Sequence, residues 1–129
     1  AALAYFARIV RRRAIVFVLS DFFDERYEAQ LRAASVRHEV IALTLNDPRE
    51  SSLPDVGLLE IEDAETGERA LLDTSSAPVR TAYAARASEL RDKRRRTLAA
   101  VGVEEVALST DRSYVEPLLR AFRARDRRR

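Results

Sequence analysis

The sequence predicts an α/β fold with three layers, in which helices cover a mostly parallel sheet and a β-hairpin is added to it. Residues 14–19 and 40–43 are continuous apolar runs of strand length, which is typical of strands that are buried on both faces. A helical pattern stands between these two runs. Strands joined through a helix are parallel neighbours, so the pattern predicts a strand–helix–strand unit.

Two helices and two strands fill the first third of the chain. Apolar residues at helical spacing predict a helix over residues 3–10, which leads into the strand at 14–19. Asp24 should cap a second helix that ends near Arg37, because short acidic side chains accept hydrogen bonds from the first helical amides. A second strand is predicted at 39–45.

A loop and a β-hairpin are predicted next. Residues 46–55 are dense in turn and breaker residues, including two prolines, and should form a surface loop. Apolar and acidic residues alternate over residues 59–62, and a second apolar segment follows at 70–72. Gly67 lies between the two segments and supplies the positive φ that a tight turn requires.

The longest helix should begin after Ser75 or Ser76 and stop at Gly102, a residue suited to the left-handed position after a helix. The basic run at residues 91–96 is expected to cover its outer face as solvated surface, with phosphate binding as the less favoured alternative. The residues predicted to face inward are Val79, Tyr83, Leu90, Thr97, Leu98 and Val101.

A third strand at residues 103–108 and a final helix complete the predicted order. Ser113 and Glu116 have the spacing of a capping box for this helix, whose inward residues are Tyr114, Leu118, Ala121 and Phe122. Residues 120–129 form a basic tail, for which we expect a frayed helix end, with binding of nucleic acid or anionic lipid as an alternative. The tail arginines are Arg120, Arg123, Arg125, Arg127, Arg128 and Arg129.

The composition narrows the possible functions. A chain of 129 residues predicts a single domain, residues 1–129, and its formal net charge is +2. The absence of cysteine excludes disulfides and thiol chemistry, and His38, the only histidine, is expected at the surface or at the start of a strand.

The chain contains no methionine, so we expect a fragment or a processed chain. No apolar run approaches the roughly 20 residues of a membrane span, so we expect a cytoplasmic location, with any anchor in upstream sequence.

Polar side chains follow the three predicted parallel strands. Because the carboxyl ends of such strands meet at one edge of a sheet, these residues are the default ligand site, and their oxygens suit Mg²⁺. Helix capping and turn formation are the favoured explanation for most of them. Asp21 is the exception, since it follows a buried strand directly. The candidate residues are Ser20, Asp21, Asn46, Asp47, Thr110 and Asp111.

An ordered set of short motifs resembles one protein family. The motifs are residues 15–22, Asp47-Pro48 with Leu53-Pro54, residues 63–68, and residues 108–111 with Tyr114. Together they resemble the C-terminal half of uncharacterised bacterial proteins that contain a von Willebrand factor A-like domain and are encoded beside MoxR-type AAA+ ATPases. The resemblance implies a partial von Willebrand A or Rossmann-like fold and a non-catalytic interaction or scaffold role with such an ATPase.

The resemblance also implies a metal site that this chain holds only in part. Asp21 matches the aspartate after the fourth strand of a metal-ion-dependent adhesion site, and Ser20 stands beside it. The other elements of that site lie upstream in the family, so we expect no cofactor in this chain. Binding of Mg²⁺ by the full-length protein is left open. A metal-dependent hydrolase that uses Asp21 and Asp111 is a further alternative.

In the family fold, the strand at residues 14–19 lies next to strands that this chain lacks. We therefore expect it to be an exposed apolar edge, and such edges pair readily with other strands. The expected result is a two-fold homodimer through residues 14–19. Nucleic acid is a less expected partner than either the ATPase or a second copy.

Overall fold

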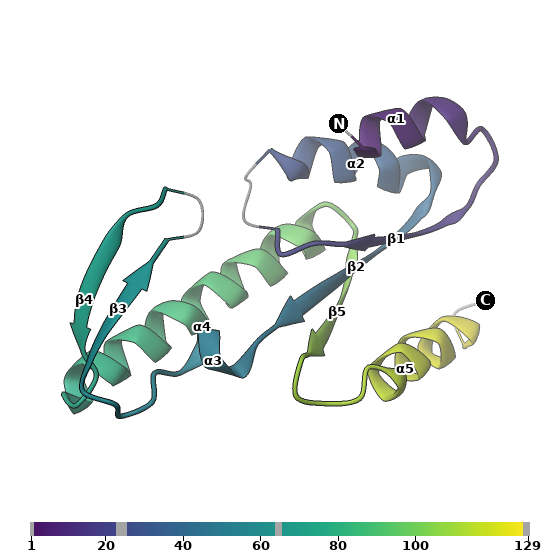
Figure 1. The fold of residues 1–129 in the computed structure, drawn as a ribbon. Helices are drawn as coiled ribbons and strands as arrows, with labels where there is room; N and C mark the ends of the chain where they lie inside the picture. The colour runs from purple at the N-terminus through teal and green to yellow at the C-terminus, as the bar shows by residue number, and fades with distance from the viewer. Residues whose placement is uncertain (1, 23–25, 64–65, 128–129) are drawn as a thin grey trace. The chain divides into compact units, whose positions relative to one another are not determined.

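The computed structural model describes residues 2–22, 26–63 and 66–127. The chain divides into two compact units, which are treated separately below (Figure 1). One unit combines Ala1–Asn46 with Asp92–Arg129, and the other is Asp47–Arg91. The boundary between them falls within the longest helix, α4 (Ala77–Ala100). The prediction of a single domain stays a prediction.

The first unit contains a three-stranded parallel sheet, as predicted. Its strands are β1 (Ile15–Leu19), β2 (Glu39–Asn46) and β5 (Glu104–Ser109), in the order β1-β2-β5. Both strand pairs are parallel, and the register places Ala42 opposite Val18 on one side and Glu105 on the other. β2 is therefore the central strand and β1 is an edge strand.

Helices flank this sheet. They are α1 (Ala2–Ile9), α2 (Tyr27–Arg37), α5 (Val115–Asp126) and the last turns of α4. One apolar cluster joins β2 to α2 and to the end of α4, and includes Leu31, Ala42 and Leu98, all essentially without solvent exposure. A second cluster joins Ile41 and Val106 to α5. Because successive strand residues face opposite sides, adjacent residues of β2 enter different clusters.

The end of α4 shows why this helix stops where the sequence predicts. Gly102 has a φ of +76°, a left-handed conformation that favours glycine. Its amide donates to the carbonyl of Ala99 at 3.1 Å, and the amide of Val103 donates to the carbonyl of Leu98 at 3.0 Å. This pattern is a Schellman motif, which satisfies the last helical carbonyls. Leu98 and Val103 are both buried in the first cluster, so the motif connects the helix end directly to β5.

The second unit contains the predicted β-hairpin. β3 (Leu58–Glu62) and β4 (Arg69–Asp73) are antiparallel, with Leu59 opposite Leu72, and Gly67 has a φ of +71°. The predicted turn residues Ala64 and Glu65 lie outside the described residues. The predicted loop before the hairpin contains a single helical turn, α3 (Pro48–Ser51). It forms because Asp47 caps it and Pro48 occupies its first position.

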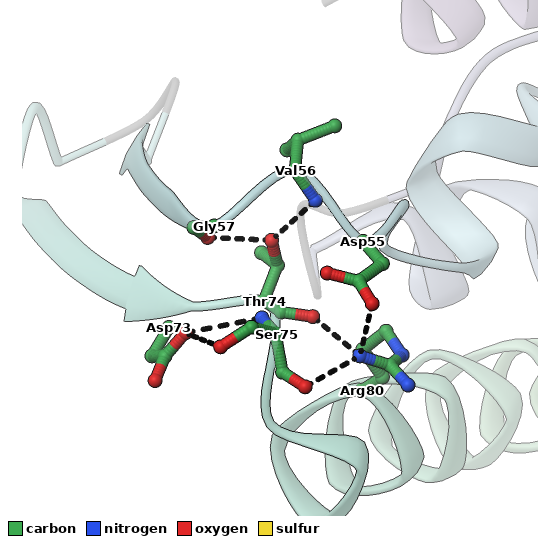
Figure 2. Close-up of polar contacts among 7 residues, drawn as sticks. All are labelled: Asp55, Val56, Gly57, Asp73, Thr74, Ser75 and Arg80. Atoms are coloured by element: carbon green, nitrogen blue, oxygen red, sulfur yellow. Dashed lines mark hydrogen bonds and ion pairs between the residues drawn. The ribbon is translucent and has the colours of Figure 1, made fainter.

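Buried polar contacts hold the base of the hairpin (Figure 2). Thr74 is fully buried, and its hydroxyl donates to the carbonyl of Gly57 at 2.6 Å and accepts from the amide of Val56 at 3.0 Å. Arg80 of α4 donates to the carbonyl of Thr74 at 2.6 Å and pairs with Asp55 at 3.5 Å. The strand that leaves the hairpin is therefore fixed to the start of α4.

The turn between β4 and α4 is stabilised by Asp73. Its carboxylate accepts hydrogen bonds from the hydroxyl and the amide of Ser75, at 2.5 and 3.1 Å (Figure 2). These two hydrogen bonds lower the pKa of Asp73, because they favour its charged form. The carboxylate therefore closes a local turn just before α4 begins.

Several predicted helix faces and caps need correction. Leu90 was predicted to face inward but is 41% exposed. Tyr114 was predicted in the inward face of the final helix but is also exposed, and it precedes α5. Ser113 accepts from the amide of Val115 at 3.3 Å instead of completing a capping box with Glu116. The predicted cap of α2, Asp24, lies outside the described residues. Helical spacing predicts a face, but the surrounding elements decide what covers it.

Candidate functional site

The carboxyl ends of the three parallel strands lie side by side in the first unit. The amide of Ser20, just after β1, donates to the carbonyl of Leu43 in β2 at 3.2 Å. The amide of Thr110, just after β5, donates to the carbonyl of Asn46 at 3.1 Å. These backbone bonds place Ser20, Asn46 and Thr110 along one edge of the sheet, where the sequence predicted them.

The tip of β1 is held by a local turn. The hydroxyl of Ser20 accepts from the amide of Phe22 at 3.1 Å and lies 3.5 Å from the carboxylate of Asp21. Phe22 has a φ of +57°, which is costly for a side chain of its size. Its ring is buried and meets the ring of Tyr27 edge-on, with 5.2 Å between the centroids. Burial of this ring holds the strained turn that carries Asp21.

The other carboxylates at the strand ends also act in local turns. Asp111 accepts a short hydrogen bond from the hydroxyl of Ser109, and Asp47, in the second unit, accepts from the amide of Arg49 at 2.9 Å. Among residues 2–22, 26–63 and 66–127, no three acidic or histidine side chains are grouped so that they could hold a metal ion. The metal-ligand role of Asp21 stays a prediction.

A buried polar cluster lies nearby, on the sheet face that carries α2 and the end of α4. Arg94 of α4 forms an ion pair with Glu105 of β5, with 3.0 Å between Nε and Oε1. The same carboxylate oxygen accepts from the hydroxyl of Thr44 at 2.8 Å, and Arg94 Nη2 donates to Asn46 Oδ1 at 3.1 Å. The two charged side chains are only 13% and 11% exposed. We name these four residues the buried polar cluster.

Tyr27 of α2 lies beside this cluster. Burial raises the pKa of its hydroxyl, and the negative charge of Glu28 acts in the same direction. The charge of Arg94 and a side-chain hydrogen bond with Thr97 oppose the shift. Folding therefore favours the protonated tyrosine. The free energy of unfolding should fall as the pH rises above about 10, the ordinary pKa of tyrosine.

The sequence prediction placed Arg94 on the outer face of α4, and this was wrong. A charged run suggested solvated surface, but Arg94 stands four residues before Leu98 and seven before Val101, so it shares their helix face. The position of Glu105 also indicated a buried ion pair, because it is an acidic residue inside a predicted strand. Taken together, the two positions predict a buried pair. Since the four residues bond to one another, the cluster attaches the last turns of α4 to the sheet.

The opposite end of the sheet contains the only histidine. His38 was expected at the surface or at the start of a strand. It is 4% exposed and directly precedes β2, so the second of these expectations is confirmed. Its Nδ1 accepts from the amide of Ala14 at 3.3 Å, and its ring meets that of Phe6 edge-on at 5.0 Å. The histidine thus connects α1 and the chain before β1 to β2.

Arg125 was predicted in a solvated tail but is buried. It lies in the last turn of α5 and forms an ion pair with Glu39 at the start of β2. Arg120 lies 3.9 Å from Glu116 in an exposed pair. Arg123 and Arg127 are exposed, and Arg128 and Arg129 lie outside the described residues. The exposed basic surface is therefore smaller than the sequence suggested, which lowers the support for nucleic-acid binding through this tail.

The outer side of β1 is an open backbone edge. The carbonyl of Ala14 and the amide of Ser20 both bond to β2. Because backbone groups alternate along a strand, the amides and carbonyls of Ile15, Phe17 and Leu19 point away from β2. No other strand of the described chain pairs with them (Figure 1). Their side chains are 44%, 43% and 61% exposed. We call these three residues the β1 edge.

Comparison with known proteins identifies the family. Residues 1–96 match the family described as "Protein of unknown function DUF58". The chain belongs to the DUF58 family. It is 35% identical to the uncharacterized protein MAV169 of Mycobacterium avium over 118 residues, which cover 91% of this chain and 69% of MAV169. It has the same identity to the uncharacterized protein Rv1480 of Mycobacterium tuberculosis, again over 91% of this chain but only 37% of Rv1480. No solved structure matches the chain significantly.

The DUF58 match covers the β1 edge and the hairpin, and it ends within α4. β5 and α5 follow the matched region, although the mycobacterial alignments extend over nearly the whole chain. Within the described part of this DUF58 chain, no helix combines the length and the apolar character that a bilayer span needs.

Proposed function

We propose that this DUF58 chain is a non-catalytic interaction or scaffold module that acts with a MoxR-type AAA+ ATPase. The motif resemblance supports the choice of partner. The observation that carries the proposal is an apolar surface on the hairpin of the second unit. Leu58 and Leu71 are 69% and 66% exposed there, in a unit where Thr74 and Arg80 already fix the base of the hairpin.

The two leucines share one face of the hairpin. Leu58 is opposite Asp73, and Leu71 is opposite Glu60, so the leucines are diagonal neighbours about 7–8 Å apart. Arg69 lies on the same face and pairs with Glu60 and Glu62, at 3.7 and 3.2 Å. An apolar centre with a charged surround is the usual composition of a protein-binding surface. A partner that covers both leucines removes their side chains from water.

We expect the double substitution Leu58→Thr with Leu71→Thr to weaken binding of the ATPase at least about tenfold. Burying a leucine side chain is worth about 1.5–3 kcal/mol, and each 1.4 kcal/mol changes Kd about tenfold. Threonine keeps the preference for strands, so the hairpin should persist. Binding is measured by calorimetry between the chain and a purified MoxR-type ATPase from the same organism.

Leu90→Gln is the matched control, because Leu90 is an exposed leucine of the same unit that lies on α4. It should bind as the unsubstituted chain does. If the unsubstituted chain fails to bind the ATPase at tens of micromolar, the partnership is wrong. If the double variant binds like the control, the ATPase contacts another surface. Unchanged circular dichroism is required for all variants.

A further inference from the structure

We propose that the apolar face of the hairpin receives a basic protein surface, and that a lysine or arginine side chain of this partner pairs with Asp73, beside Leu58 and Leu71. This contact rests on the proposed function, because it uses the same face of the hairpin. It adds the chemistry that the partner must present there. A peptide probe that replaces the ATPase allows the basic contact and the ATPase partnership to fail separately.

Asp73 lies on the same face of the hairpin as the two leucines. It is directly opposite Leu58 in the register of β3 and β4, and it is two residues from Leu71 along β4. Such positions point to one face of a sheet, with about 4.5–5.5 Å between the β-carbons of directly opposite residues. A partner that covers the leucines therefore also covers this carboxylate. It must supply a positive charge, because a charge that is removed from water without a partner is costly.

The carboxylate of Asp73 is charged, oriented and without a cation. Its Oδ1 accepts from the hydroxyl and the amide of Ser75, at 2.5 and 3.1 Å, and these bonds lower its pKa (Figure 2). Asp73 is exposed, and no basic side chain in the described part of the chain pairs with it. Asp55 differs, because it already pairs with Arg80 at 3.5 Å. Asp73 is therefore the carboxylate on this face that is ready for a cation from a partner.

The charge of the whole hairpin segment favours the same kind of partner. Residues 55–73 contain seven acidic side chains and one basic side chain, a net charge of −6 in a chain whose total is +2. The basic residue, Arg69, is shared by Glu60 and Glu62. A surface of this sign repels nucleic acids and anionic lipids and attracts basic protein surfaces. Charge complementarity therefore selects a protein with lysine or arginine around an apolar centre.

Charge variants of the hairpin test the contact by calorimetry with the purified ATPase. Asp73→Asn removes the charge but keeps an oxygen that can hold the turn, and it should raise Kd about tenfold. Arg69→Gln should lower Kd about two- to fivefold, because it leaves Glu60 and Glu62 free to attract the partner. Glu89→Gln is the matched control. It removes one exposed negative charge from α4 in the same unit, and Kd should stay unchanged.

Two results of this titration would overturn the basic contact and leave the role of the leucines intact. One is an equal Kd for Asp73→Asn and Glu89→Gln. The other is a higher Kd for Arg69→Gln, which would indicate an acidic partner surface. Added salt should also weaken the unsubstituted chain more than it weakens Asp73→Asn, because salt screens exposed charges.

Peptide probes test the charge preference without the ATPase. A short peptide of alternating lysine and leucine should shift the NMR signals of the Leu58 and Leu71 methyl groups, and a peptide of glutamate and leucine should not. Asp73→Asn should weaken binding of the lysine peptide. Equal shifts with both peptides, or no shift with the lysine peptide at about millimolar concentration, would overturn the proposal. Shifts that depend on protein concentration alone would also overturn it, because a second copy would then cover this face. Binding of the lysine peptide by a chain that does not bind the ATPase would support the basic contact and exclude the ATPase as its partner.

Discussion

Glu105→Ala is expected to lower the free energy of unfolding by about 3–5 kcal/mol. The substitution leaves Arg94 charged and almost buried, and it removes the acceptor of the Thr44 hydroxyl. An uncompensated buried charge is among the most costly changes that a single substitution can make. Urea denaturation followed by circular dichroism measures the loss. Arg94→Ala should have an effect of similar size, because it leaves Glu105 without its cation.

Two further variants distinguish the effect of breaking the buried ion pair from the effect of removing any charged side chain. Replacing both residues, Arg94→Met with Glu105→Met, should recover most of the stability, because no isolated charge then remains. Arg95→Ala should change the free energy of unfolding by less than about 1 kcal/mol, since Arg95 pairs with Asp92 at 3.6 Å on the exposed side of α4. If Glu105→Ala were as mild as Arg95→Ala, Arg94 and Glu105 would not be a buried pair in solution.

Leu98→Ala is expected to cost about 2–5 kcal/mol, whereas Leu90→Ala on the same helix should cost less than about 1 kcal/mol. Leu98 has no solvent exposure and contacts the first apolar cluster, so its truncation leaves a cavity. Leu90 is 41% exposed. Helical spacing alone predicted both as inward-facing residues. The two variants therefore test whether the loss of stability follows the burial seen in the structure or the helical spacing of the sequence. Equal losses in urea denaturation would show that Leu90 is also buried.

The sequence was sufficient to predict the sheet and its connections. Continuous apolar runs located β1 and β2, the helix between them implied a parallel pair, and Gly102 located the end of α4. The crossover geometry and the left-handed backbone depend on a few neighbouring residues, so these signals are local. The predicted burial of β1 on both faces was wrong, because Ile15, Phe17 and Leu19 are 44%, 43% and 61% exposed. The α/β fold with a separate hairpin follows from the local signals.

The polar residues were harder to predict. Arg94 was assigned to solvent because it lies in a basic run, and His38 was expected at the surface or at the start of a strand. Both are buried through contacts with residues far away in the sequence, Glu105 and Ala14. Long-range pairs of this kind depend on which strands become neighbours. Ser20, Asn46 and Thr110 lie at one edge of the sheet as predicted. The candidate carboxylates act in turns that sequence spacing could not distinguish from a ligand site.

Calorimetry between the chain and a purified MoxR-type ATPase tests the proposed interaction role most directly. We expect the unsubstituted chain and Leu90→Gln to bind with equal Kd values, and Leu58→Thr with Leu71→Thr to raise Kd at least about tenfold. No binding at tens of micromolar, or equal binding by the double variant and by Leu90→Gln, would contradict the proposed role of the hairpin.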